Sequence, residues 1–109
     1  MKLSVLERLM AVGLLPEKGS FTNLKLIRVA REALSFNDGE HKALNFRVEK
    51  DPQGNDLTRW NDAAVPDKEI SLGEVVTHMI VKELKELNDK EELKPEQFTL
   101  YEKFVEKST

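Results

Sequence analysis

The sequence contains no cysteine and only two histidines, and this restricts its chemistry. Without cysteine the chain forms no disulfide and has no thiolate nucleophile, and a zinc site would need histidine and carboxylate ligands alone. His41 and His78 fall in different expected helices, and neither has a partner at HExxH spacing. We therefore expect both histidines to face solvent, and we expect no metal ion and no other cofactor.

Long apolar runs are also missing. Residues 1–15 are apolar enough to suggest a signal peptide, but Glu7 and Arg8 interrupt them and no small-residue cleavage site follows. A segment that spans a bilayer needs about 20 uninterrupted apolar residues. We therefore expect a soluble, cytoplasmic protein that does not associate with membranes.

The usual catalytic motifs are absent as well. No serine lies in a G-x-S-x-G turn, and the five glycines are scattered rather than gathered in a phosphate-binding loop. Nothing in the sequence marks a nucleophile and its base. We therefore expect that the protein is not an enzyme.

What the chain does have is enough apolar material for one modest core. It has 109 residues, of which 39% are hydrophobic and 34% are charged. Leu, Val, Ile and Phe are spread along the whole chain, which favours a folded protein over a disordered one. We expect a single compact domain over residues 1–109.

Charge is divided unevenly along the chain. Residues 1–50 hold nine basic and six acidic side chains, a net charge of +3. Residues 51–109 hold eight basic and fourteen acidic side chains, a net charge of −6. The pattern predicts a basic element and an acidic element, either of which could meet a partner of opposite charge.

Periodicity predicts three helices in the first part of the chain, over residues 4–15, 20–34 and 37–44. Ser4 with Glu7 has the spacing of a capping box, and Asn37 or Asp38 can cap the third helix. In the second helix we expect one apolar arc and an opposite basic face. The arc comprises Leu26, Ile27, Val29, Ala30, Ala33 and Leu34, and the basic face comprises Lys25, Arg28 and Arg31.

The period changes after residue 44. Residues 45–60 read as a β-hairpin whose turn is rich in Asp, Pro, Gly and Asn. A loop and a short extended piece follow up to residue 70. Ser71 then caps the longest expected helix, over residues 72–88, and Pro95 opens a final helix over 95–106. The sequence predicts an α+β fold that is mostly helical, with about five helices and one hairpin between the third and fourth helices. The chain is expected to have three parts: helices over 1–44, a hairpin and loop over 45–70, and a helical pair over 71–107.

The start of the second helix is a candidate site for a small anion. Ser20 or Thr22 lies at a helix N-terminus, where unpaired N–H groups attract negative charge, and Lys18 and Lys25 flank it. The alternative is that Ser20 or Thr22 simply caps the helix while the lysines are solvated.

The basic face formed by Lys25, Arg28 and Arg31 is a candidate contact for a partner. Three charges without interleaved aromatic residues, in a chain with an acidic second half, make direct nucleic-acid binding unlikely. The face could instead pair with the acidic helices of the same chain.

Two further residues stand out. Glu83 falls in the middle of the apolar arc of its helix, so it either faces a ligand or partner, forms a salt bridge to Arg8, Arg28 or Arg31, or lies at the rim of the core. Trp60, beside Arg59, is either an interface residue or the side chain that seals the hairpin onto the helices.

Three segments resemble a group of small bacteriophage and prophage proteins of unassigned function. They are Leu14–Phe21 (LLPEKGSF), Leu34–Phe36 with Glu40–Lys42, and Leu100–Phe104 (LYEKF). The resemblance covers nearly the whole chain, but its motifs are not catalytic and no functional residue carries over. It implies a setting, the cytoplasm of a phage-infected bacterium, where short charged proteins often act by binding.

These observations favour a non-enzymatic protein-interaction module. We expect an accessory or inhibitor protein that binds a host or phage assembly, with self-association as a homo-oligomer left open. The alternative is a protein that binds a small anionic, nucleotide-like ligand at the Ser20/Thr22 helix start.

Overall fold

The computed structural model describes residues 1–106, which are mostly helical and include two small antiparallel strand pairs. The fold class is therefore the expected one, α+β and mostly helical. Contacts divide the chain into two compact units. Unit 1 comprises Met1–Ser35 together with Lys68 onward, and unit 2 comprises Phe36–Asp67. The expectation of a single domain over residues 1–109 stays a prediction.

Helix α1, Val5–Leu14, is the central element of unit 1. It begins with the expected capping box, in which the Glu7 N–H donates to Ser4 Oγ (3.2 Å) and the Ser4 N–H donates to Glu7 Oε1 (2.9 Å). The helix contacts α2, α4, α5 and β1. It therefore has buried residues on more than one side, as its broad apolar pattern predicts.

Helix α2, Phe21–Leu34, buries only part of its expected apolar arc. Ile27, Ala30 and Leu34 are buried, but Leu26 and Val29 are exposed, and their expected burial was wrong. The reason is geometric. At about 100° per residue, Val29 lies about 160° around the helix from Ile27, so one packed side cannot cover both.

Helix α4, Gly73–Asp89, does not begin as predicted. Its N-cap position is Leu72, with no side-chain cap, so the assignment of Ser71 as the cap was wrong. Gly73 has a φ of +79°, and this left-handed residue turns the chain into the helix in place of a serine cap. Val76, Ile80 and Leu84 are buried, whereas Val75 is exposed.

The end of the described chain is one continuous helical stretch that changes from a 3-10 helix to an α-helix and then to a π-helix. A 3-10 turn, η2 (Pro95–Gln97), leads into α5 (Phe98–Tyr101) and then into a π-helical segment, η3 (Glu102–Glu106). This matches the helix expected over 95–106, and residue 107 lies outside the described residues. Leu100 and Phe104 are buried, but Phe98 is exposed.

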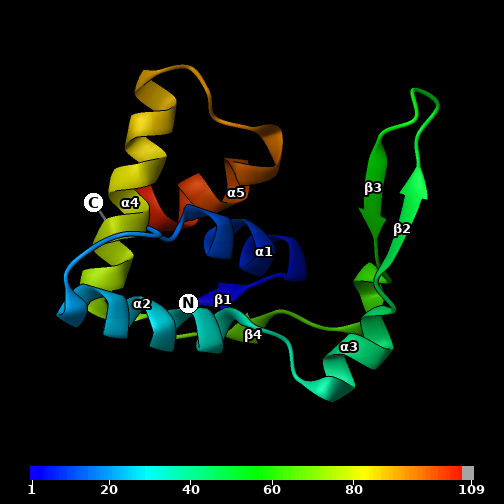
Figure 1. The fold of residues 1–109 in the computed structure, drawn as a ribbon, viewed down its shortest axis with the longest axis horizontal. Helices are drawn as coiled ribbons and strands as arrows, with labels where there is room; N and C mark the ends of the chain where they lie inside the picture. Colours follow the sequence, from blue (N-terminus) through cyan, green and yellow to red (C-terminus); the bar gives the residue numbers. More distant parts are fainter. Residues whose placement is uncertain (107–109) are drawn as a thin grey trace. The chain divides into compact units, whose positions relative to one another are not determined.

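A strand pair joins the two sequence segments of unit 1. Strand β1, Lys2–Leu3, runs antiparallel to β4, Lys68–Glu69, with Lys2 opposite Glu69. Figure 1 shows the two strands side by side. The sequence did not predict this pair, because two-residue strands are too short to show alternation.

Around these elements the core of unit 1 is apolar, and its members with the lowest exposure include Leu3, Ala11, Leu34, Ile80, Leu84, Leu100 and Phe104.

Unit 2 consists of a short helix and the expected hairpin. Helix α3, Asp38–Leu44, begins with a capping box between Asn37 and Glu40. Strand β2, Arg47–Lys50, runs antiparallel to β3, Asp56–Arg59, and a 3-10 turn, η1 (Asp62–Ala64), follows (Figure 1). The hairpin thus lies between the third and fourth helices in chain order, as predicted.

The turn of the hairpin is shaped by one carboxylate and one glycine. Asp51 Oδ1 accepts hydrogen bonds from the Gln53 and Asn55 N–H groups (2.9 and 2.8 Å), and Gly54 has a φ of +85°. This is the local bonding through which aspartate favours turns.

In residues 1–106 no helix is long and apolar enough to cross a membrane.

Candidate functional site

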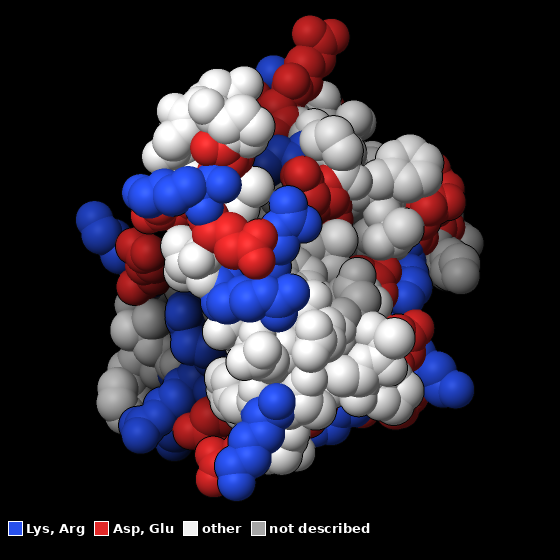
Figure 2. Space-filling model, turned by 90° about the vertical axis from the view of Figure 1, so that its right-hand side faces the viewer, with Lys and Arg blue, Asp and Glu red and all other residues white. Residues whose placement is uncertain are grey.

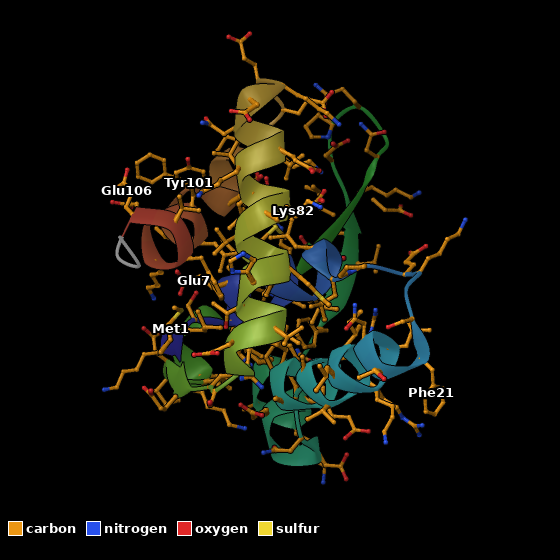
Figure 3. The ribbon with its side chains drawn as sticks, turned by 90° about the vertical axis from the view of Figure 1, so that its left-hand side faces the viewer. Met1, Glu7, Phe21, Lys82, Tyr101 and Glu106 are labelled. Carbon is orange, nitrogen blue, oxygen red and sulfur yellow. The ribbon has the colours of Figure 1, made fainter. Side chains whose placement is uncertain are left out.

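The outward side of α2 carries exposed apolar and basic side chains together. Phe21 is 79% exposed and Val29 is 64% exposed. Figure 3 shows Phe21 at the start of the helix, extending away from it. Lys25 and Arg28 lie on the same side, whereas Arg31 lies about 160° around the helix from Val29. We call Phe21, Lys25, Arg28 and Val29 the α2 surface.

Two of these residues contact each other. The Lys25 Nζ lies 5.7 Å from the centre of the Phe21 ring, which is within the range of a cation–π contact. The two residues are one helical turn apart, so the contact follows from their i,i+4 spacing. The ring and the ammonium group therefore form one exposed feature.

Arg28 and Arg31 of α2 are not neutralised by the acidic helices. Arg28 Nε lies 3.9 Å from Glu32 Oε1 in the same helix, and both side chains are highly exposed. Within residues 1–106, Arg31 makes no ion pair. The basic face predicted from Lys25, Arg28 and Arg31 is thus present and faces solvent.

The candidate anion site at the start of α2 contains a serine that caps the helix. Ser20 Oγ accepts a hydrogen bond from the Asn23 N–H (3.1 Å), so Ser20 caps α2 and Thr22 lies in its exposed first turn. Lys18 is exposed in the preceding loop. The capping role of Ser20 is confirmed, and the binding of an anion at this helix start stays a prediction.

Glu83 is half-buried at the edge of a cleft of about 410 Å³ between the end of α1 and α4. Within the described residues it makes no ion pair, so the possible salt bridges to Arg8, Arg28 or Arg31 are not formed. The rim position is the alternative that the structure matches. The lining also includes Leu14 and Met79, together with the charged side chains of Glu17, which follows α1, and of Lys82 and Glu86 in α4.

Arg8 is fully buried and binds backbone oxygens of α2. Its Nε donates to Leu34 O (3.2 Å), and its Nη2 donates to Ser35 O. These carbonyls lie at the C-terminus of α2, where backbone oxygens have no partner within the helix. Arg8 therefore fixes α2 against α1, and this holds the α2 surface outward.

Glu7 is the second buried charged residue of α1. Its Oε1 lies 2.7 Å from Lys103 Nζ, which also donates to Lys2 O (2.8 Å). Burial raises the pKa of Glu7, but the hydrogen bonds from Lys103 and from the Ser4 N–H, the nearby Thr99 side chain and the Lys103 charge together lower it by more, so its pKa lies below the ordinary value. The pair links α1, β1 and η3, and Figure 3 shows Glu7 beside the C-terminal segment.

Trp60 and Arg59 belong to unit 2, each with its own contacts. The Trp60 ring lies 6.0 Å from that of Phe46, which in turn lies 5.6 Å from Phe36 and 5.7 Å from His41. Arg59 Nε lies 2.9 Å from Glu49 Oε2. Trp60 therefore attaches the hairpin to aromatic side chains around α3, which supports its sealing role.

The remaining candidates for chemistry among the described residues are the two histidines and the carboxylates. Both histidines are exposed, although the His41 ring also packs on Phe36 and Phe46. No group of three or more His, Asp or Glu side chains within residues 1–106 is placed to hold a metal ion. On the face displayed in Figure 2, basic and acidic side chains are intermixed rather than gathered into one area of either sign.

Sequence reasoning identified the basic part of the α2 surface but missed its apolar part. Phe21 received no role, and Val29 was expected in the core. The signal was available, because Val29 and Ile27 cannot share one packed face at about 100° per residue. The buried roles of Glu7 and Arg8 had no such signal, because their partners are distant in sequence.

Comparison with protein-family models, curated proteins and solved structures gave no match for this chain.

Proposed function

We propose that this protein is a non-enzymatic protein-interaction module that docks an acidic protein partner on its α2 surface. The observation that carries the proposal is the exposure of Phe21 and Val29 on a helix side that also presents Lys25 and Arg28. Aromatic and arginine side chains are enriched in protein interfaces relative to the rest of the protein surface. A partner that buries them would recover apolar area that is exposed to water in the free protein.

Charge determines the kind of partner. The α2 surface has two basic groups, Lys25 and Arg28, and Arg28 forms an exposed ion pair with Glu32 of the same helix at 3.9 Å. A partner surface with carboxylates around an apolar centre would therefore meet cations whose one competing pair is exposed and weak. The sequence favours a protein over nucleic acid, because the whole chain has a net charge of −3.

The test is photo-crosslinking from the α2 surface. A photoreactive phenylalanine analogue is placed at residue 29, and cells of the organism that encodes the chain are irradiated. The matched control places the same analogue at Phe98, which is 62% exposed on α5. We expect one discrete protein to crosslink from residue 29 and not from residue 98. That protein should have an acidic surface, and its capture should be lost in Arg28→Glu.

Equal crosslinking from both positions, or capture that Arg28→Glu does not change, would contradict the proposal. The biological setting rests on the resemblance to phage proteins alone. We propose accordingly that the partner is a component of a host or phage assembly in the bacterial cytoplasm, and that the chain acts on it as an accessory or inhibitor protein.

A further inference from the structure

The hairpin of unit 2 presents open strand edges. All eight residues of β2 and β3 are exposed, and in residues 1–106 neither strand pairs with a third. Val48 is 67% exposed in the middle of β2. An isolated two-stranded hairpin is only marginally stable in water, and an unpaired edge is a ready template for another strand.

The charges on one hairpin face are unevenly satisfied. Arg47 and Arg59 lie directly opposite each other, and both contact Glu49, at 3.3 Å and 2.9 Å. Like charges in opposite positions destabilise a strand pair. Two guanidinium groups therefore share one carboxylate, and the further hydrogen bonds of Arg47 run to neutral groups, Asn45 O (3.3 Å) and Asn61 Oδ1 (3.5 Å).

We infer that β2 pairs antiparallel with β2 of a second copy of this chain, around a two-fold axis at Val48, to form a four-stranded sheet. A two-fold axis perpendicular to a sheet places one residue opposite its own copy. With Val48 at the axis, Arg47 of each copy lies opposite Glu49 of the other. Each Arg47 then has a carboxylate directly across from it, in addition to the shared one.

Other two-fold registers of β2 are unfavourable. An axis at Glu49 places two carboxylates opposite each other, and an axis at Arg47 or Lys50 places two cations opposite each other. The edge of β3 offers no charge pairing, because an axis at Leu57 places Asp56 opposite Thr58. The same charges that protect the edge from unrelated strands thus select this one register.

The opposite face of the hairpin is also compatible with this register. Val48 and Thr58 are cross-strand partners, so the dimer places two Val48 side chains between two Thr58 side chains. Rows of β-branched residues favour strand pairing. Lys50 of one copy lies opposite Phe46 of the other, where the ammonium group can approach the ring.

This inference concerns a surface separate from the α2 surface and does not depend on the proposed function. An interface of four residues per chain is smaller than a standard protein interface, so the dimer is weak. We expect the average mass in sedimentation equilibrium to rise from that of one chain at about 10 µM towards that of two chains at about 1 mM. The variant Phe21→Ser should behave in the same way.

Charge complementation tests the register. The variant Arg47→Glu places Glu opposite Glu in a homodimer, and Glu49→Arg places Arg opposite Arg, so each alone should remain monomeric at about 1 mM. A mixture of the two places opposite charges across the axis at both positions and should form the heterodimer. A wild-type protein that stays monomeric at all concentrations, or a mixture that stays monomeric, would overturn the inference.

Single-cysteine crosslinking provides an independent geometric test, since the chain has no cysteine of its own. Val48→Cys should form a disulfide-linked dimer under mild oxidation, because directly opposite residues are close enough for a disulfide. The matched control is Thr58→Cys, on the same face of the hairpin. Its two copies would lie about 14 Å apart across three strand spacings and should not crosslink. Equal yields from the two variants would contradict the register.

Discussion

The Lys103 Nζ lies 2.7 Å from Glu7 Oε1 and ties the C-terminal helical segment to the first helix. The Glu7 carboxylate is almost fully buried, whereas Lys103 retains partial exposure. The other oxygen, Glu7 Oε2, is buried without a hydrogen-bond partner within the described residues. The pair therefore holds a buried carboxylate in place through one main cation.

Removing that cation should destabilise the fold. In Lys103→Met the Glu7 carboxylate would stay buried without its ion partner, and we expect a loss of about 2 kcal/mol in the free energy of unfolding. Urea denaturation measures it. The matched control is Lys85→Met, which removes an exposed lysine from α4 and should change stability by no more than about 0.5 kcal/mol. Equal losses in both variants would show that the Glu7–Lys103 pair has no special role.

The same carboxylate predicts a pH dependence. The pKa of Glu7 is lower in the folded protein than its ordinary value of 4.5, so the unfolded chain binds a proton more readily. The stabilisation is therefore fully present above about pH 4.5 and is lost as the pH falls through the folded pKa. Urea midpoints between about pH 6 and about pH 3 should fall less steeply in Glu7→Gln than in the wild type.

Glu69 contributes in the same direction, because a hydrogen bond from the N-terminal amine lowers its pKa. The variant Glu69→Gln separates the two groups. If Glu7→Gln has the same acid dependence as the wild type and Glu69→Gln does not, the assignment to Glu7 is wrong.

Arg8 should tolerate no replacement that loses its planar group. Both of its described hydrogen bonds run to carbonyl oxygens at the end of α2, and the side chain is fully buried. Arg8→Lys keeps the charge but cannot reproduce the two-atom geometry, so we expect a loss of about 2 kcal/mol in unfolding free energy. A loss below about 0.5 kcal/mol would contradict the role of the guanidinium group.

Two glycines should respond to alanine with opposite signs. Gly73 has a φ of +79°, so Gly73→Ala should destabilise the protein by about 1 kcal/mol. Gly13 lies within α1 with open space around an added Cβ, so Gly13→Ala should stabilise it by about 0.5 to 1 kcal/mol. Thermal unfolding of the two variants checks both signs. Shifts of equal sign would contradict the backbone argument.

Sequence patterns predicted most of the helices and the hairpin, because the hydrogen bonds that begin these elements join residues close together in the sequence. The capping boxes at Ser4 and Asn37 and the turn at Asp51 each involve residues within four positions, and all three regions formed as expected. The start of α4 failed because a left-handed glycine can replace a serine cap, which residue type alone does not reveal.

The candidate site was harder to predict because exposure depends on distant packing. The basic residues of α2 could be identified from helical spacing, but whether Glu83 neutralises them depended on where α4 lies against α2. Arg8 and Glu7 resemble ordinary charged residues of an amphipathic helix. Their burial follows from contacts with Leu34 and Lys103, which are far away in the sequence.

The affinity of the captured partner for α2 variants tests the central claim most directly. Titration calorimetry should show that Phe21→Ser weakens binding at least about tenfold and that Phe98→Ser changes it less than about twofold. Raising the salt concentration from about 50 to about 300 mM should weaken wild-type binding and have a smaller effect on Arg28→Glu. Equal affinities for the wild type and Phe21→Ser would contradict the claim that the α2 surface is the docking site.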